Sequence, residues 1–284
     1  LATGNYRREG TGAYPLRGHN NVQGACDMGS LPGWLPGYQH VSDATAREKF
    51  ETAYGVTIDE NPGLDNIRML QSIEEGKMKA MYLVGEDMAL VDSDANHVDK
   101  VLSDLDFFVV QDIFFSRTAQ YADVILPAAP SLEKEGTFTN TERRVQRLYQ
   151  ALPTLGDSKP DWWIIQEIAN RLGANWTYDS PSDIFSEMAS LAPIFGKANY
   201  DVLEGWNSFL WGSHDGESTP LLYEDGFDFP DKMARFALSD WVEPFTFAEE
   251  FDLHINNGRM LEHFHEGNLT NKSTGIQSEV PEIF

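Results

Sequence analysis

The chain has 284 residues and a formal net charge of −24, because 45 acidic residues outnumber 21 basic ones. This charge repels a phosphate backbone unless the basic residues gather on one face, so nucleic acid is not an expected partner. A content of 41% hydrophobic and 12% aromatic residues argues against disorder, and the length suggests about two domains. No apolar run reaches the roughly 18 residues of a membrane helix, and the first residues lack the apolar core of a signal peptide. We therefore expect no membrane insertion. A cytoplasmic location is a separate expectation, which does not follow from the missing signal peptide.

Cys26 is the only cysteine. An internal disulfide is excluded, and so is a zinc or iron–sulfur site bound by several cysteines of this chain. The chain opens without Met and ends on the apolar run Val-Pro-Glu-Ile-Phe. From these ends we expect a piece of a longer polypeptide.

Residues 14–41 form a polar segment in which repeated glycines forbid a long regular element. Its hydrogen-bonding side chains could bind an anion or a polar cofactor. The alternative is a solvated surface loop, which is what most segments of this composition form. These side chains are Arg17, His19, Asn20, Asn21 and Gln23. A helix is expected next over 42–54, with Ser42 or Asp43 as its cap and Gly55 at its end.

Helices and strands then alternate, as in a doubly wound parallel sheet with right-handed crossovers. The predicted elements are a helix over 66–75, a strand over 80–84, a helix over 94–105, and strands over 107–110 and 124–126. The last two are continuous apolar runs, which indicate strands covered on both faces. We predict that the stretch from 128 to 147 is a loop.

Polar residues follow two of these strands at the point where each ends. Gly85, Glu86 and Asp87 follow the first strand, and Gln111 and Asp112 end the second. Ligands of open parallel sheets bind beyond the carboxyl ends of the strands, so these groups can read the ring or ribose of a nucleotide. Asp112 can equally cap the next helix, and Ser116 offers itself for the same role. No GxGxxG follows the first strand, so an ordinary nicotinamide dinucleotide site has little support.

Beyond residue 150 we predict a helix that Asp161 caps, another over 182–192, a loose connection over 198–243, and a strand over 251–255. Arg259, His263 and His265 lie close together after that strand. Two histidines on one face of a strand can bind a metal, but a third ligand of convincing spacing is lacking. Hydrogen bonding to phosphates or heterocycles, and ordinary loop contacts, remain alternatives.

Five blocks of this sequence resemble the molybdopterin oxidoreductase family, in the same order and spacing over most of the chain. They are LRGHNNVQGACDMG (16–29), LVGEDMAL (83–90), VVQDIF (109–114), TAQYADVILPAA (118–129) and EKEGTFTNTERRVQ (133–146). The first block most resembles the catalytic subunit of formate dehydrogenases. The resemblance implies a Rossmann-like α/β fold followed by the start of a β-rich domain. Its expected divisions are a glycine-rich active-site loop (1–40), a dinucleotide-binding domain (41–200), a connection (201–247) and a truncated pterin-capping domain (248–284).

Members of this family bind one molybdenum or tungsten ion through two pterin guanine dinucleotides, which the resemblance implies for this chain's parent protein. Arg17 occupies the place of the arginine that faces formate beside the metal, and His19 matches a position near the pterin and the proton path. Asp161 matches an aspartate that reads the guanine edge, a role that competes with helix capping. The positions implied to line the dinucleotide are Gly85, Glu86, Asp87, Val91, Gln111, Asp112 and Ala128. Arg259, Met260, His263 and His265 match the segment that closes over the pterins.

The family's metal ligand, a cysteine or selenocysteine, lies upstream of these blocks, and Cys26 stands in the wrong motif to replace it. We expect no metal ligand in this chain, and a 4Fe-4S cluster held elsewhere in the parent protein. The expectation is a segment of a formate dehydrogenase catalytic subunit, inactive alone, whose partners are formate, the rest of the subunit and electron-transfer subunits. The alternative is a non-catalytic scaffold subunit of a respiratory redox complex, and a nitrate-reducing relative is a weaker possibility. Arg17 favours the enzyme, because a scaffold has no use for a formate-facing arginine.

Overall fold

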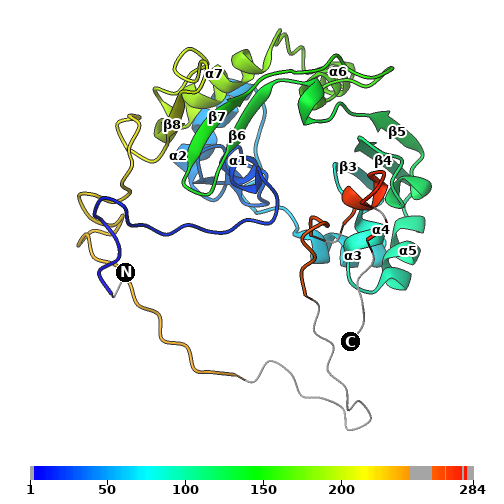
Figure 1. Ribbon diagram of the computed structural model, residues 1–284, viewed down its shortest axis with the longest axis horizontal. Coiled ribbons are helices and arrows are strands. Elements are labelled where there is room, and N and C mark those ends of the chain that lie inside the picture. Colours follow the sequence, from blue (N-terminus) through cyan, green and yellow to red (C-terminus); the bar gives the residue numbers. More distant parts are fainter. Residues whose placement is uncertain (1–2, 243–257, 266, 277, 280–284) are drawn as a thin grey trace. The chain divides into compact units, whose positions relative to one another are not determined.

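The computed structural model describes residues 3–242, 258–265, 267–276 and 278–279. The chain divides into two compact units, Gly12–Leu222 and a second made of Leu1–Thr11 with Tyr223–Phe284. The elements are labelled along the chain in Figure 1. Within the described residues, no helix combines the length and the apolar character that crossing a membrane requires.

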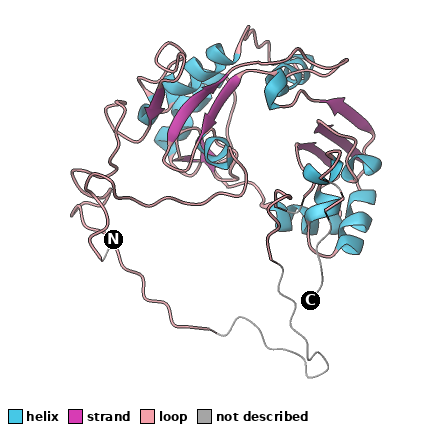
Figure 2. Ribbon diagram, viewed as in Figure 1, coloured by secondary structure: helices cyan, strands magenta, loops and turns pink. Residues whose placement is uncertain are grey.

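The larger unit contains a parallel sheet of three strands, β3 (Ala80–Val84), β4 (Phe107–Asp112) and β5 (Val124–Pro127), in that order. Helices α4 (Met88–Val91) and α5 (Ala95–Ser103) connect β3 to β4, and the short 3-10 helix η1 (Thr118–Tyr121) precedes β5. Figure 2 shows this alternation of helix and strand. The predicted α/β fold with a parallel sheet is confirmed.

One face of the parallel sheet packs against helices. Phe108 and Val110 of β4 join a buried cluster with α5, with α4 and with α3 (Asn66–Glu74). On the opposite face Tyr82, Val84 and Phe107 are 40%, 43% and 49% exposed within the described part of the chain. The prediction of strands covered on both faces is therefore wrong for this chain, because α3, α4 and α5 all pack against the face that carries Phe108 and Val110.

A second, antiparallel sheet follows, made of β6 (Gly136–Thr139), β7 (Arg144–Leu148) and β8 (Ser208–Leu210) in that order. The prediction of a loop up to residue 147 is wrong, because β6 and β7 form a hairpin there, in which Val145 is fully buried. Strand β8 pairs with β7 from within the segment that the sequence favoured as a connection. Helix α7 (Pro181–Leu191), predicted over 182–192, and η3 (Pro193–Phe195) supply the core residues that pack with this sheet.

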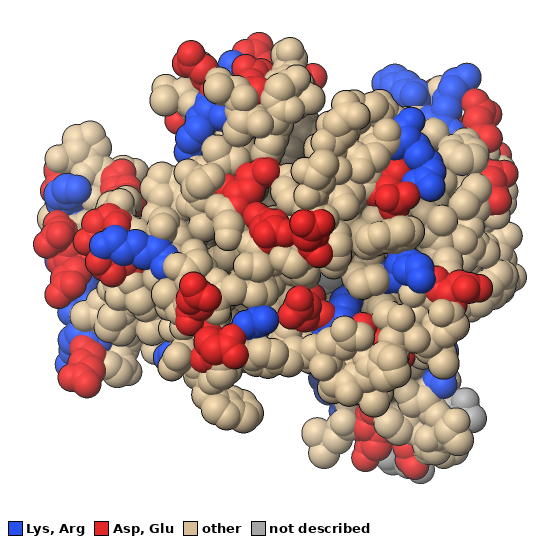
Figure 3. Space-filling model, turned by 90° about the horizontal axis from the view of Figure 1, so that it is seen from above, with Lys and Arg blue, Asp and Glu red and all other residues tan. Residues whose placement is uncertain are grey.

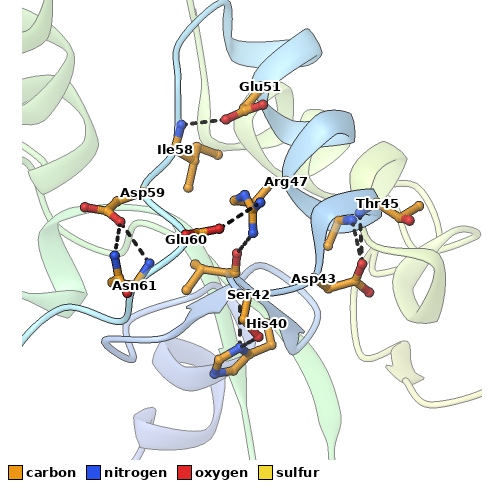
Figure 4. A network of polar contacts seen from close by, with 12 residues as sticks. His40, Ser42, Asp43, Thr45, Arg47, Glu51, Ile58, Asp59, Glu60 and Asn61 are labelled. Atoms are coloured by element: carbon orange, nitrogen blue, oxygen red, sulfur yellow. Dashed lines mark hydrogen bonds and ion pairs between the residues drawn. The ribbon is translucent and has the colours of Figure 1, made fainter.

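The segment before the parallel sheet holds α1 (Val22–Asp27), the short strands β1 (Trp34–Leu35) and β2 (Gln39–His40), and α2 (Ala44–Tyr54). Helix α2 confirms the prediction: Asp43 accepts hydrogen bonds from the backbone of Thr45 and Ala46, and Gly55 ends the helix in a left-handed conformation. The start of α2 is also held by Arg47, which donates to the Val41 carbonyl at 2.6 Å and pairs with Glu60 at 3.6 Å (Figure 4).

Helix α6 (Asp161–Arg171) and the 3-10 turn η2 (Ser131–Glu133) complete the larger unit. In the smaller unit, Tyr6 stacks on Phe227 with ring centroids 6.2 Å apart, and η4 (Thr270–Lys272) is its one helical turn within the described ranges. The strand predicted over 251–255 lies outside the described residues.

Candidate functional site

The carboxyl end of the parallel sheet gathers predicted nucleotide-binding residues. Gln111 is fully buried, and its amide nitrogen donates to a carboxylate oxygen of Asp161 at 2.7 Å. The side-chain oxygen of Gln111 accepts a hydrogen bond from the Tyr82 hydroxyl. The Lys134 ammonium forms an ion pair with the other oxygen of Asp161. Two residues that were predicted separately, 50 positions apart, therefore meet in one polar cluster.

Asp161 does not cap its helix, so that prediction is wrong. It is the first residue of α6, the N-cap is Pro160, and no side chain caps the helix start. A carboxylate in the first turn still interacts favourably with the helix dipole. Its side chain instead points to Gln111 and Lys134, which leaves a half-buried carboxylate at the sheet's carboxyl end.

The chain reaches this position through a short parallel bridge beside β5. Ala128 pairs with Lys159, and the Ala129 amide donates to the Lys159 carbonyl at 2.8 Å. The Ala128 amide donates to the Asp112 carbonyl at 3.0 Å, which ties the same segment to the end of β4. Residues 158–161 are thereby fixed next to the carboxyl ends of β4 and β5.

Tyr82 and Lys134 were not predicted as site residues. Tyr82 stands on the open face of β3, directly across from Val109, and reaches the next residue on that face of β4, Gln111. Burial, with the negative charge of Asp161, raises the pKa of Tyr82, so its hydroxyl stays protonated as a donor. The alternation along β3 could have suggested Tyr82, whereas no sequence signal pairs Lys134 with Asp161.

The loop after β3 is ordered by its own carboxylates. Asp87 is 3% exposed and accepts hydrogen bonds from the Thr118 amide at 2.9 Å, the Thr118 hydroxyl at 2.8 Å and the Arg117 amide at 3.2 Å. The Glu86 carboxylate accepts from the Asp87 amide, and Gly85 takes a left-handed conformation with φ of 69°. The Asp87 side chain therefore joins the loop after β3 to the turn before β5, and Val91, at the end of α4, is half-buried behind it.

Ser116 and Asp112 were both predicted as possible caps of the helix after β4, and only Ser116 has this role. Ser116 accepts a hydrogen bond from the Ala119 amide at 3.1 Å. The Asp112 carboxylate accepts from the adjacent Ile113 amide, and it is half-buried at the end of β4. Ser116 and Asp87 thus cap η1, and Asp112 stays at the edge where the nucleotide was predicted.

The segment around Arg17 is held against the β6–β7 hairpin. The Asn21 side chain accepts a hydrogen bond from the Thr139 amide at 2.9 Å, and a Cβ at Gly24 would lie 2.2 Å from that same Asn21 oxygen. A side chain at position 24 would therefore displace the Asn21 side chain from its hydrogen bond to Thr139. Arg17 is exposed, and its guanidinium donates a hydrogen bond to the side-chain oxygen of Gln23 at 3.3 Å. His19 is half-buried.

A buried acid lies behind Arg17. Asp27 is fully buried, and one of its oxygens accepts from the Gln23 amide and from the Tyr38 hydroxyl, both at 2.8 Å. The other oxygen has no hydrogen-bond partner among the described residues, and neither has the nearby Trp211 indole nitrogen. Burial raises the pKa of Asp27 to about 6, against the opposing effect of its polar neighbours, Gln23 first, then Tyr38, Trp211 and Thr139.

This raised pKa predicts a pH-dependent stability. The folded protein binds the Asp27 proton more tightly than the unfolded chain, whose ordinary value is 3.8. The contribution of Asp27 to the free energy of unfolding is therefore complete below about pH 4 and is lost as the pH rises through about 6. The loss is about 3 kcal/mol, since one pKa unit corresponds to about 1.4 kcal/mol. Arg17 lies beyond Gln23, to which it donates, and the Arg143 guanidinium lies over the Trp211 ring, 5.6 Å from its centroid.

We expect Asp27→Asn to remove this pH dependence, because Asn carries no charge. The melting temperature of the variant relative to the wild type should rise between pH 5 and pH 8, whatever its offset at pH 5. Thermal unfolding of the full-length protein measures this difference, with Asp157→Asn, an exposed position, as the control. A difference that stays constant over this pH range would contradict the assignment.

The four predicted residues near the C-terminus belong to the smaller unit. The Arg259 guanidinium lies within hydrogen-bond distance, 3.2 Å, of the His265 ring nitrogen Nδ1. The His263 ring contacts the Thr270 hydroxyl at 2.9 Å and the Glu279 carbonyl at 2.8 Å. Met260 is half-buried nearby. The two histidines lie in bends and a turn with separate partners, so the alternative of one strand face shared by two metal ligands is wrong. The described ranges contain no group of three His, Cys, Asp or Glu side chains that could hold a metal ion.

Comparison with known proteins identifies the family of this chain. The family model described as "Molybdopterin oxidoreductase" matches residues 1–171, which is more than half of the chain. The chain is 83% identical over 284 residues to "Putative formate dehydrogenase YrhE" and 58% identical over 285 residues to "Probable oxidoreductase YjgC", both of Bacillus subtilis (strain 168). In each case the alignment covers all of this chain and 29% of the relative. Among solved structures, acetylene hydratase from Pelobacter acetylenicus aligns with a TM-score of 0.46 and 19% identity, over 62% of this chain and 27% of that one.

The chain is an α/β protein with polar groups at the carboxyl end of a parallel sheet. It belongs to the molybdopterin oxidoreductase family. Membership implies a molybdenum or tungsten pterin cofactor. The chain spans 29% of the length of the curated relatives that it matches, so much of such a protein lies in other segments.

Proposed function

We propose that this chain is part of the catalytic subunit of a molybdenum- or tungsten-dependent formate dehydrogenase, which oxidises formate to carbon dioxide. The observation that carries the proposal is Arg17, an exposed guanidinium in the sequence RGHNN, whose segment is held against the β6–β7 hairpin through Asn21. The name of the relative that is 83% identical, "Putative formate dehydrogenase YrhE", supports the same reaction.

Arg17 would bind the formate carboxylate. A guanidinium presents parallel N–H donors that match the two oxygens of a carboxylate, and it stays charged at every physiological pH. Binding through both oxygens fixes the plane of formate. Holding a substrate in the reactive orientation lowers the activation barrier. The neighbouring His19 would receive the proton on a ring nitrogen, which can act as an acceptor.

Oxidation of formate to carbon dioxide releases two electrons and one proton. The metal–pterin group, when bound, supplies the acceptor for those electrons, and the chain's own residues bind and orient. A 4Fe-4S cluster, which residues outside this chain would hold, would supply the path to electron-transfer partners.

The polar cluster at the carboxyl end of the sheet fits a guanine dinucleotide. Guanine presents two adjacent N–H groups on one edge, and a carboxylate held in place, such as Asp161, is the matching acceptor. Lys134 is paired with Asp161 in this structure and would hold that carboxylate in its charged form for guanine. Gln111 would orient Asp161 through their 2.7 Å hydrogen bond.

Metal and nucleotide analysis of the full-length protein tests the proposal. Protein made in a host that builds the cofactor should contain molybdenum or tungsten, release about two guanine nucleotides per chain on denaturation, and reduce a dye with formate. Folded protein with neither metal nor nucleotide would instead support a non-catalytic scaffold with this fold.

The chain carries a net charge of −24. On the face shown in Figure 3, acidic and basic side chains lie interspersed. A small anion such as formate therefore depends on a local positive group, and Arg17 would provide it.

A further inference from the structure

Arg17 is an exposed side chain whose end is held by a buried one. Its guanidinium donates to the Gln23 carbonyl at 3.3 Å, and Gln23 is only 5% exposed on helix α1. A long arginine side chain has high conformational entropy, so an acceptor fixed in the protein reduces the cost of holding it in one place.

The orientation of the Gln23 amide is set by two acceptors on its other side. Its nitrogen donates to Asp27 at 2.8 Å and to the Tyr38 hydroxyl at 2.9 Å. Rotating the amide by 180° would place its carbonyl against the Asp27 carboxylate, which repels it. The Gln23 carbonyl therefore faces Arg17.

Tyr38 completes the arrangement, because its hydroxyl donates to Asp27 at 2.8 Å while it accepts from Gln23. Its ring lies 5.7 Å from that of Trp211, so the phenol is positioned by packing as well as by hydrogen bonds. Two donors thus converge on one oxygen of Asp27, and the three side chains form a closed polar triangle.

The buried carboxylate of Asp27 lowers the stability of the folded protein. It is fully buried, and its second oxygen has no hydrogen-bond partner among the described residues. A neutral side chain of similar shape would cost less. A buried charge that lowers stability, next to an exposed guanidinium, is typical of a functional site, because function and not stability accounts for it.

We propose that Tyr38, Asp27 and Gln23 form a relay that positions the Arg17 guanidinium for the carboxylate of its substrate. The three are positioning residues, since none of them needs to touch the substrate. The inference rests on the proposed function, in which Arg17 binds formate.

The test uses the full-length protein loaded with its cofactor and the variant Gln23→Met, which keeps the side-chain length but removes the amide. Phenylglyoxal modifies arginine, and mass spectrometry of the peptide that contains Arg17 gives the rate at that residue. The formate concentration that halves this rate reports formate binding at Arg17 without turnover. We expect Gln23→Met to raise that concentration about tenfold, as loss of one hydrogen bond to a charged group would. The KM for formate should rise by a similar factor, with a smaller change in kcat.

The matched control is Cys26→Ala, which alters a buried side chain of the same helix outside the relay. It should leave the protection of Arg17 as in the wild type. Tyr38→Phe provides a second variant, since it keeps the ring against Trp211 and removes only the hydroxyl. It decides the test if Gln23→Met does not fold, and we expect weaker protection by about threefold or more.

The outcomes separate the two proposals. If formate does not protect Arg17 in the wild type, formate binding by Arg17 is wrong and the proposed function loses its main support. If formate protects the wild type and the folded relay variants equally, the relay is overturned while the proposed function stands.

Discussion

Replacement of Arg17 by Ala in the full-length protein is expected to lower kcat/KM for formate by about 100-fold to 1000-fold, the usual effect of removing one charged group from an anion site. The variant loses the carboxylate's partner, whereas the fold is little affected because the side chain is exposed. Steady-state kinetics with a dye acceptor measures the change, together with the metal content of each preparation.

Two variants sharpen this result. Arg17→Lys keeps the charge but loses the paired N–H donors, so we expect an intermediate value of kcat/KM. Arg68→Ala removes another exposed arginine, on α3, where it pairs with Asp65 at 3.6 Å, and should leave kcat/KM unchanged. Wild-type kinetics in Arg17→Ala would remove Arg17 from the site.

The second large effect is expected for Asp161→Asn. The amide keeps the shape of the carboxylate but replaces one acceptor by a donor, which would face an N–H group of guanine. Mismatched pairing of this kind costs about 1–3 kcal/mol, or roughly 10-fold to 100-fold in affinity. We therefore expect purified Asp161→Asn protein to retain less guanine nucleotide and less metal per chain than the wild type.

Asp157→Asn, four residues earlier and exposed, controls for the loss of one negative charge. Nucleotide release and metal analysis on the same preparations give both quantities, and the melting temperature checks the fold. Full retention of cofactor in folded Asp161→Asn would show that the cluster of Gln111, Asp161 and Lys134 does not bind the nucleotide.

Local sequence signals determined much of the fold. Asp43 and Gly55 mark the ends of α2 because capping depends on neighbouring residues alone. The strands β3, β4 and β5 follow from short apolar runs, and their parallel arrangement follows from the helices between them. The hairpin of β6 and β7 gave no such signal, since its residues are polar and partly exposed, and its burial depends on α7 and β8 from far along the chain.

The sequence by itself also determined which residues end the strands, and the blocks around Arg17, Gln111 and Asp161 indicated the family. Only the tertiary structure decided how those side chains pair. Asp87 faces inward to Thr118, Asp161 meets Gln111 instead of capping α6, and Gln23, Asp27 and Tyr38 close behind Arg17. Such pairs join positions that are as many as 50 residues apart, so they depend on strand register and on the packing of loops against the sheets. Periodicity and capping describe only the immediate neighbourhood of each residue, which is why they indicated Gln111 and Asp161 but not their pairing, and did not indicate Asp27 or Tyr38 at all.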